Sequence, residues 1–286
     1  MSNSIIDDRF YFSSETISLI KNYSGATFVI KYGGSAMKDE SIQSNIIQDI
    51  SLLSSLGINI ILVHGGGYII DHWLKKLNIT PVFQDGIRIT DYSTVEVVEM
   101  VLSAKVNKSL VSQFNKRNIL SVGLSGKDAN LITASPISDM SENYTGKVDN
   151  VNPFLLSTLL SNGFLPVVSS VACDVEGKTY NLNADTVASS IAASLSVDKY
   201  ILITDTPGVL KDLKDSNSLM KNLTITQVNQ LKNDGTISGG MIPKLDSCVY
   251  SLLNNVKEAH IIDGRLRHSL LHQTLTYAGR GSKIVK

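Results

Sequence analysis

Two lysines and a short polar run contain the residue types that phosphoryl transfer requires. The run is Asn181-Leu-Asn183-Ala-Asp185, and Lys31 and Lys244 lie far from it and from each other in the chain. Two ammonium groups could neutralise the oxygens of a phosphoryl group in transfer, and the Asp185 carboxylate could hold both of them in place. The residues predict a site in which catalysis is mainly electrostatic.

Two glycine-rich segments could add backbone amides to this site. Lys31-Tyr-Gly33-Gly34 and His64-Gly65-Gly66-Gly67 each follow an apolar run, which indicates a buried strand that ends in a phosphate-sized loop. Taken alone, the first segment fits better a tight turn with a surface lysine. The second is more specific, because three glycines between a strand and a helix favour amides aimed at an anion.

Arg88 and Asn181 are candidates for binding the rest of a substrate. Arg88 lies in an expected hairpin over residues 82–90, where its guanidinium could bind a carboxylate through two hydrogen bonds. An ordinary surface arginine explains this segment equally well. Asn183 is expected to cap the following helix, and that role leaves Asn181 available to bind an amide or a carboxylate.

Two later segments could contact a nucleotide. A Pro-Gly turn follows the apolar run before Thr204, and the segment continues to Asp212, while Gly239-Gly240 opens the helix that carries Lys244. Turns of this kind are also common structural features. The chain has neither a Rossmann glycine fingerprint nor a Walker A loop, which disfavours a P-loop kinase. No Ser/His/Asp or Cys/His spacing suggests a covalent nucleophile.

Strand and helix patterns alternate along the chain. We expect strands at residues 27–31, 58–63, 165–168, 199–204 and 259–262, and helices at 13–23, 39–56, 68–77, 93–116, 152–161, 184–195, 224–232 and 240–254. This order predicts a single α/β domain with an open, mostly parallel sheet covered on both faces. Ligands of such sheets bind at the carboxyl ends of the strands, where both glycine-rich segments fall.

Composition narrows the function classes. The 286 residues carry a formal net charge of zero and show no basic stripe, so we expect no nucleic-acid partner. No apolar run is long enough to span a membrane. Cys173 and Cys248 have no metal-ligand spacing and do not make a disulfide framework, which favours a reducing intracellular compartment. The first residues resemble neither a signal peptide nor a transit peptide.

The ordered set of motifs resembles the amino-acid kinase superfamily, and within it the acetylglutamate kinases of arginine biosynthesis. The resemblance runs from about residue 25 to the C-terminus and rests on six motifs in order. They are Lys31-x-Gly-Gly, His64-Gly-Gly-Gly, Gly86-x-Arg88-x-Thr90, Asn181-x-Asn-Ala-Asp185, Thr204-Asp205-x-x-Gly208-Val-Leu and Gly240-Met-x-x-Lys244. The resemblance implies an open αβα sandwich, with an N-terminal arm at residues 1–24 and the kinase domain at 25–286.

The implied reaction moves the γ-phosphoryl group of ATP onto the side-chain carboxylate of N-acetyl-L-glutamate. A glutamate side chain in water has a pKa of about 4.3, so this carboxylate is already ionised at neutral pH and no general base is required. The resemblance implies that Lys31 and Lys244 stabilise the transferring group and that Asp185 orients both lysines. It also implies that Gly66 and Gly67 hold the substrate and the phosphoryl group. Arg88 would bind the α-carboxylate of the substrate, and Asn181 would bind its acetylamino group. The implied nucleotide contacts are Gly34, Asp205, Lys211 and Met241, with Mg²⁺ between the phosphates and no metal-ligand set in the protein.

The resemblance also implies regulation. The helix at 13–23 is similar to the extra helix that interlaces dimers into hexamers in arginine-inhibited members, and 268–273 with 279–282 resemble their site for L-arginine as feedback inhibitor. Gln273 stands where that family pattern usually has an acidic residue, so we expect weaker inhibition. Photosynthetic relatives bind the PII signalling protein, and the implied setting is the cytoplasm or the plastid stroma of a chloroplast.

Two alternatives remain open. One is a sibling kinase for glutamate, aspartate, carbamate or UMP, and the pairing of Asn181 and Asp185 with Arg88 favours acetylglutamate over these. The other is a non-catalytic sensor of arginine or a nucleotide on the same fold. Retention of both lysines and Asp185 argues against the sensor.

Overall fold

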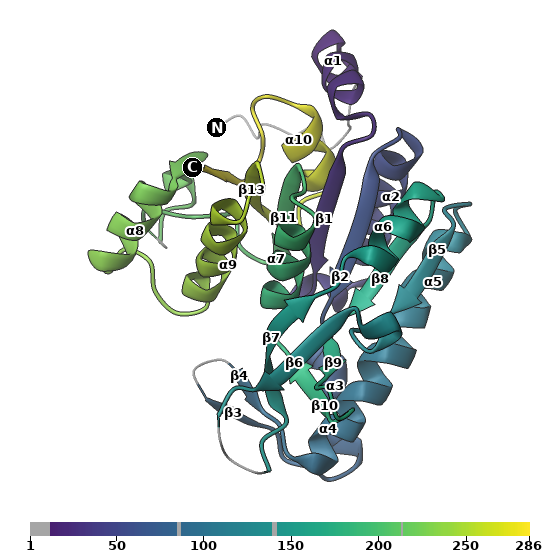
Figure 1. Cartoon of the computed structure of the whole chain (residues 1–286). Coiled ribbons are helices and arrows are strands. Elements are labelled where there is room, and N and C mark those ends of the chain that lie inside the picture. The colour runs from purple at the N-terminus through teal and green to yellow at the C-terminus, as the bar shows by residue number, and fades with distance from the viewer. Residues whose placement is uncertain (1–11, 85–86, 139–141, 213) are drawn as a thin grey trace.

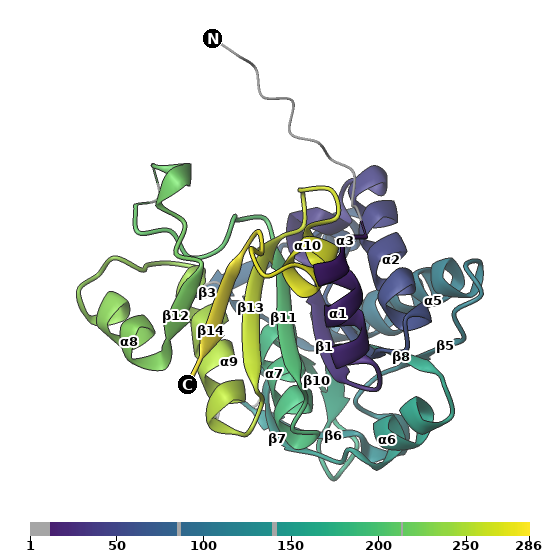
Figure 2. The same cartoon turned by 90° about the horizontal axis from the view of Figure 1, so that it is seen from above.

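An eight-stranded sheet forms the centre of the molecule. The computed structural model describes residues 12–84, 87–138, 142–212 and 214–286. The strand order is β12-β14-β13-β11-β1-β2-β8-β5, and the pairing is parallel except between β13 and β14 (Figures 1 and 2). The strands are β1 (Thr27–Tyr32), β2 (Asn59–His64), β5 (Ser121–Leu124), β8 (Leu165–Ser169), β11 (Lys199–Thr204), β12 (Asn222–Thr224), β13 (Glu258–Asp263) and β14 (Ser282–Val285). The predicted fold class, a mostly parallel α/β sheet, is confirmed.

Helices cover both faces of this sheet. They are α1 (Ser14–Tyr23), α2 (Glu40–Ser55), α3 (Gly67–Lys76), α4 (Tyr92–Glu99), α5 (Asn107–Asn115), α6 (Phe154–Ser161), α7 (Ala184–Ser194), α8 (Ile225–Asn233), α9 (Met241–Leu253) and α10 (Ser269–Leu275). Alternation along β1 explains the two layers: Phe28 and Ile30 join the core under α2 and α5, and Val29 joins the core under α7 and α9. Lys31 therefore points to the face of the sheet that α7 covers.

A smaller β-group lies at the carboxyl ends of the central strands. It consists of β6 (Ile132–Pro136), β7 (Thr145–Val151), β9 (Val171–Cys173) and β10 (Thr179–Leu182). The predicted hairpin is present as β3 (Val82–Gln84) and β4 (Ile87–Ile89), which pair antiparallel. Figure 1 places this group and the hairpin at the bottom, opposite α1 and α10. Asp85 and Gly86, which belong to the predicted arginine motif, lie outside the described residues, as do residues 1–11 of the predicted arm.

Local signals account for the helix ends. The Ser13 side chain accepts a hydrogen bond from the Thr16 amide (3.2 Å) and begins α1, while Thr224 and Gln227 form a capping box at α8. The helix expected at 93–116 differs from a regular α-helix, because residues Met100–Val106 between α4 and α5 adopt a π-helix. None of the helices in the described ranges is long and apolar enough to cross a membrane.

Candidate active site

Lys31 and Lys244 converge on Asp185. Lys31 Nζ lies 2.8 Å from Asp185 Oδ1, and Lys244 Nζ donates to Asp185 Oδ2 at 3.2 Å. The three residues come from the end of β1, the first turn of α9 and the first turn of α7. Their side chains are 11%, 22% and 9% exposed, respectively, so the cluster is mostly desolvated but open on the Lys244 side. The predicted convergence of the two ammonium groups is present in the structure.

Asp185 remains ionised although it is buried. Burial raises the pKa of its carboxyl group, but the charges and hydrogen bonds of Lys31 and Lys244 outweigh that effect and lower the pKa to about 2. The cluster of three groups therefore carries one net positive charge, from two ammonium groups and one carboxylate. A pocket with this charge attracts an anion such as a phosphoryl group.

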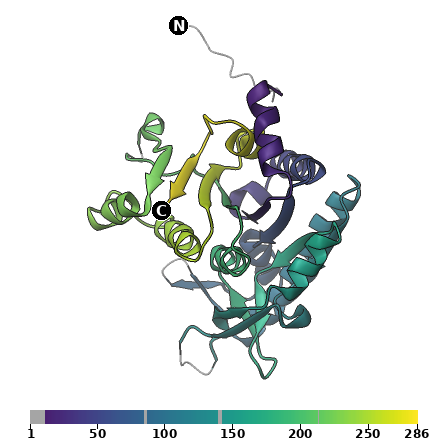
Figure 3. The same ribbon diagram turned by 45° about the horizontal axis from the view of Figure 1, so that its top comes forward.

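The backbone around Asp185 is fixed by its neighbours. The Asn183 side chain accepts hydrogen bonds from the amides of Asp185 (2.8 Å) and Thr186 (3.2 Å) and so caps α7, as predicted. On the other side, the buried Tyr200 hydroxyl lies 3.0 Å from the Asp185 carbonyl and 3.2 Å from Ser247 Oγ of α9. These contacts join α7 to α9, which lie side by side in Figure 3, and hold Lys244 close to Asp185.

The two glycine-rich loops meet beside the lysines. Strands β1 and β2 are in parallel register, with Tyr32 opposite His64, so both loops leave the same edge of the sheet. A Cβ atom added at Gly33 would lie 3.2 Å from Lys31 Nζ and 3.7 Å from the Gly65 amide nitrogen. Gly66 caps α3 and Gly67 is its first residue, so their amides have no intrahelical partner and can bind an anion.

Arg88 lies beside the second glycine loop, with Nη2 3.5 Å from the Gly67 carbonyl oxygen, and is 7% exposed. One nitrogen, Nη2, donates to Asp71 Oδ1 at 2.6 Å, and the guanidinium stacks 4.6 Å from the centre of the Phe83 ring. The other terminal nitrogen, Nη1, is buried and makes no hydrogen bond within the described residues. A buried guanidinium nitrogen with unused donors is suited to binding a carboxylate.

Asn181 lies on β10 and is linked to the Arg88 strand. Its side-chain nitrogen donates to Thr90 Oγ1 at 3.1 Å, and Thr90 in turn donates to the Arg88 carbonyl at 3.1 Å. Thr145 Oγ1 donates to the same carbonyl at 2.9 Å. Asn181 and Arg88 are therefore held in one hydrogen-bonded unit.

The predicted nucleotide segments form a cavity of about 200 Å³. Residues 206–210, residues 236–238 and Met241 line it, so the structure brings one of the four predicted nucleotide residues, Met241, into the wall. Asp205 and Lys211 are exposed and flank this cavity in sequence, and Gly34 opens the short helix Gly34–Met37 after β1. The segment 236–238 was not predicted from the sequence.

The described residues contain no group of three His, Cys, Asp or Glu side chains that could hold a metal ion. Mg²⁺ usually keeps several waters and binds through substrate phosphates with one or two carboxylates. The donors at this site, two lysines and backbone amides, fit an anion, so a magnesium ion would enter with the nucleotide phosphates.

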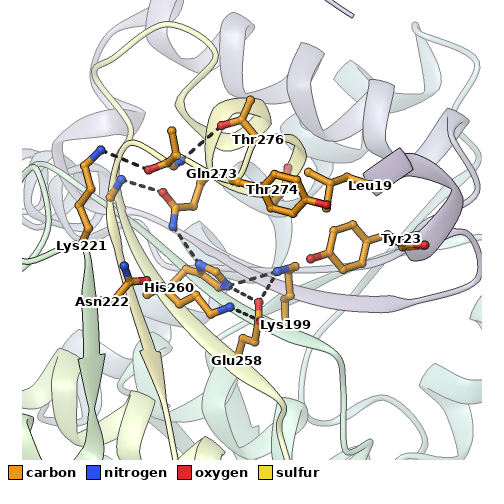
Figure 4. A pocket seen from close by; sticks show the side chains of 16 residues that line it. Leu19, Tyr23, Lys199, Lys221, Asn222, Glu258, His260, Gln273, Thr274 and Thr276 are labelled. Carbon is orange, nitrogen blue, oxygen red and sulfur yellow. Dashed lines mark hydrogen bonds and ion pairs between the residues drawn. The ribbon is translucent and has the colours of Figure 1, made fainter. Parts of the chain in front are cut away.

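A second cavity, of about 330 Å³, lies between α1 and α10 near the amino ends of β11 and β13 (Figure 4). Lys199, Lys221 and Lys283 line it together with one carboxylate, Glu258. Glu258 is already paired with Lys199, with Lys283 and with His260 Nε2 at 3.2 Å. Burial raises its pKa, but the hydrogen bonds from His260, Lys199 and Lys283 and the charge of Lys199 hold it well below its usual range.

Gln273 closes the same cavity. Its Oε1 atom accepts hydrogen bonds from the amides of Arg280 (2.8 Å) and Gly281 (2.7 Å), and its Nε2 atom donates to His260 Nδ1 at 3.0 Å. The carboxamide thus links the 279–281 turn, through its oxygen, to His260 of β13, through its nitrogen. Tyr23 and Leu19 of α1 also line this space, so the N-terminal helix and the tail, far apart in sequence, form one cavity.

Comparison with known proteins identifies the family of this chain. Residues 26–263 match the family described as "Amino acid kinase family". The chain belongs to the amino acid kinase family. It is 52% identical over 279 residues to an acetylglutamate kinase of Gracilaria tenuistipitata var. liui, covering 97% of this chain and 98% of that protein, and 51% identical over 272 residues to one of Trichormus variabilis, covering 95% and 92%. Within the family it is an acetylglutamate kinase, which phosphorylates the side-chain carboxylate of N-acetyl-L-glutamate in arginine biosynthesis.

Solved structures confirm the fold. N-acetylglutamate synthase from Neisseria gonorrhoeae, complexed with coenzyme A and L-arginine, aligns with a TM-score of 0.81 at 23% identity, over 95% of this chain and 64% of that longer chain. Carbamate kinase from Giardia lamblia bound to AMP-PNP aligns with a TM-score of 0.65 at 16% identity, over 92% and 99%. At these identities the likeness establishes the fold alone.

Some residues that shape the site were not predicted from the sequence. Asp71 contacts Arg88, Tyr200 contacts the Asp185 carbonyl, and Asn107 contacts His64 (3.1 Å). The two residues of each pair lie far apart in the chain and meet only in the folded structure. A polar residue at a regularly buried helix position, as Asn107 is, is the one hint that the sequence contained.

Proposed function

We propose that Lys31, Lys244 and Asp185 perform the phosphoryl transfer from ATP to N-acetyl-L-glutamate. One observation carries the proposal. Two ammonium groups contact one buried, ionised carboxylate at the edge of the sheet from which both glycine-rich loops leave. The difficulty of the reaction is the approach of a carboxylate anion to a polyphosphate. Fixed positive charge and amide dipoles in a desolvated pocket lower that barrier.

In this proposal each part of the site has one task. The Arg88 guanidinium binds the α-carboxylate of the substrate, and Asn181 binds its acetylamino group. The substrate side chain then extends toward the amides of Gly66 and Gly67, where the phosphoryl group arrives between the two lysines. Because the nucleophile is already an anion at neutral pH, positioning and charge stabilisation supply the catalysis without a general base.

The nucleotide occupies the cavity beside α9 in this scheme. Met241 and residues 206–210 contact the base and sugar, while Gly34, Asp205 and Lys211 lie toward its phosphates. Mg²⁺, bound to the phosphates, supplies further neutralisation of their charge.

A coupled assay of ADP release tests the proposal. N-acetyl-L-glutamate should support turnover, whereas L-glutamate, L-aspartate, carbamate and UMP should give little or none. Equal or higher activity with any of the other acceptors would favour a sibling kinase. Absence of turnover with every acceptor, with the fold intact by circular dichroism, would favour a sensor.

We also infer feedback regulation by L-arginine in the cavity between α1 and α10, in a hexamer built from dimers through α1. Three lysines suit the α-carboxylate of an amino acid, and α1 itself forms part of the cavity wall. Sedimentation should give six subunits, and arginine should inhibit. A dimer that millimolar arginine does not affect would refute this part of the proposal.

We infer a compartment and one further partner from the resemblance to photosynthetic relatives rather than from the site. Relatives include proteins of the alga Porphyra purpurea and of cyanobacteria, and we infer either the cytoplasm or the plastid stroma as the compartment. A pull-down with purified PII protein tests the second inference, binding of that regulator: retention of the chain on immobilised PII supports it, and no retention contradicts it.

A further inference from the structure

His64 occupies an unusual place for a histidine. It is the last residue of β2, it is completely buried, and the loop Gly65-Gly66-Gly67 follows it directly. Its ring has a partner on each nitrogen: Nδ1 lies 3.0 Å from the Gly65 carbonyl oxygen, and Nε2 lies 3.1 Å from Asn107 Nδ2. The reaction described above assigns no task to this ring.

The partners determine where the ring proton lies. Asn107 Nδ2 also lies 2.8 Å from the Val167 carbonyl and 3.3 Å from the Leu124 carbonyl, so this atom of the carboxamide must be the nitrogen. Because a carboxamide nitrogen only donates, His64 Nε2 must accept. The proton therefore lies on Nδ1, which donates to the Gly65 carbonyl. Burial lowers the His64 pKa to about 4, which agrees with a neutral ring at pH 7.

This hydrogen bond orients a catalytic amide. The Gly65 carbonyl and the Gly66 N–H belong to the same planar trans peptide and point in opposite directions. A carbonyl held toward the buried ring therefore directs the Gly66 N–H away from the core. Glycine tolerates many backbone conformations, so three consecutive glycines need such an external restraint to keep one orientation.

The π-helix supplies the other half of the restraint. A Cβ atom added at Gly66 would lie 2.8 Å from Leu102 Cδ2 and 3.2 Å from Val106 Cγ2, so the residues of this segment press directly on the loop. Asn107 follows Val106 immediately. The wider turn of a π-helix shifts the register of all later residues, and it places Asn107 where the carboxamide reaches His64. Such segments often occur at functional sites.

We propose that Asn107 and His64 form a clamp that holds the Gly65–Gly66 peptide with its amide facing the transferring phosphoryl group. Both are positioning residues, since they act through the Gly66 amide and touch neither substrate. The clamp rests on the proposed role of Gly66 in this kinase. This role explains why a histidine precedes the glycine loop.

Three variants test the clamp by turnover. In His64→Asn the side-chain amide nitrogen comes near the position of Nδ1 and can still donate to the Gly65 carbonyl, while His64→Leu has similar bulk and no donor. We expect kcat to fall by about 10- to 100-fold in His64→Leu and Asn107→Leu, with the KM for ATP nearly unchanged, and to recover most of its value in His64→Asn. Leu110→Ala, a buried change one turn further along α5, is the control: it should lower the melting temperature without this loss of kcat.

A measurement on the unmodified protein is independent of variant folding. Nitrogen-15 NMR of the imidazole ring at pH 7 should show His64 protonated at Nδ1 and not at Nε2. Protonation at Nε2, or equal kcat in His64→Leu and His64→Asn, would overturn the clamp. Failure of the whole proposed function would look different, because the unmodified enzyme would then show no turnover with N-acetyl-L-glutamate.

Discussion

Lys31 and Lys244 bind the same carboxylate from different environments. Lys31 extends from a central strand, whereas Lys244 is more exposed and lies in the first turn of α9. A positive charge there opposes the helix dipole, which already presents positive charge at that end. The Asp185 carboxylate offsets this repulsion. The remaining positive charge is stabilised further when an anion binds beside it. Lys244 should therefore act mainly in the transition state, when charge develops on the transferring group.

Lys244→Ala should lower kcat by about 100- to 1000-fold while changing the KM for N-acetyl-L-glutamate much less. Steady-state kinetics with both substrates measures this. Lys232→Ala is the matched control, because that lysine also pairs with an aspartate, Asp246, but at the surface. An unchanged kcat in Lys244→Ala would remove this lysine from the chemistry.

Asp185 also makes stability depend on pH. Its folded-state pKa is about 2, against 3.8 for an aspartate in the unfolded chain, so its ionised form stabilises the native state by about 2 kcal/mol. Since the folded pKa is the lower one, this contribution is present above about pH 4 and is lost as the pH falls toward 2. Urea unfolding between pH 2 and 5 should show this slope in the unmodified protein and a smaller slope in Asp185→Asn. Identical slopes would contradict the assignment.

At the scale of elements, α2 and α10 are joined by a buried ionisable pair. Asp49 of α2 is 2% exposed and accepts a hydrogen bond from His268 Nδ1 at 2.7 Å, at the residue that precedes α10. Burial raises the pKa of Asp49 to about 6, although His268 partly opposes the effect. The position of α10, which carries Gln273, therefore depends on a carboxylate in a different helix.

Asp49→Asn should flatten the pH dependence of stability between pH 4 and 6. Because the folded pKa of Asp49 is higher than 3.8, its contribution to the free energy of unfolding is fully present below about pH 4 and is lost as the pH rises through 6. The loss is about 3 kcal/mol when Asp49 titrates independently of His268. Thermal or urea unfolding at several pH values measures the difference. Asp246→Asn, at a surface position, is the control and should leave the slope unchanged.

The sequence predicted the elements because their signals are local. Apolar runs that end at Lys31 and at His64 mark buried strands, and Asn183 marks the start of α7, so the edge where the site lies could be located without coordinates. The π-helix could not be predicted, because its apolar positions fit the spacing of a regular α-helix as well as that of a π-helix. The contact of Asn107 with His64 joins residues 43 apart in the chain and depends on that register shift, so it follows only from the packed structure.

In the whole molecule, the proposed effector cavity and the lysine cluster lie at opposite ends of the central parallel strands. The proposed effector cavity lies at the amino ends of β11 and β13, whereas the lysine cluster lies at the carboxyl end of β1. Strand β11 contacts both regions: Lys199 lines the effector cavity, and the next residue, Tyr200, contacts the Asp185 carbonyl. An effector that draws Lys199 away from Glu258 would therefore act on a strand that also supports Asp185.

Gln273→Glu should make the enzyme more sensitive to arginine. In the present chain the one carboxylate on the described wall of the cavity, Glu258, is already paired with two lysines, so a guanidinium finds no free anionic partner there. A glutamate at 273 could still accept from the Arg280 and Gly281 amides while adding a negative charge. A charge-assisted hydrogen bond is stronger than a neutral one by about 1 kcal/mol or more, which corresponds to roughly a fivefold to tenfold lower arginine concentration for half-inhibition. Inhibition curves for the unmodified enzyme, Gln273→Glu and the surface control Gln230→Glu measure this, and coincident curves for all three would show that residue 273 does not face the effector.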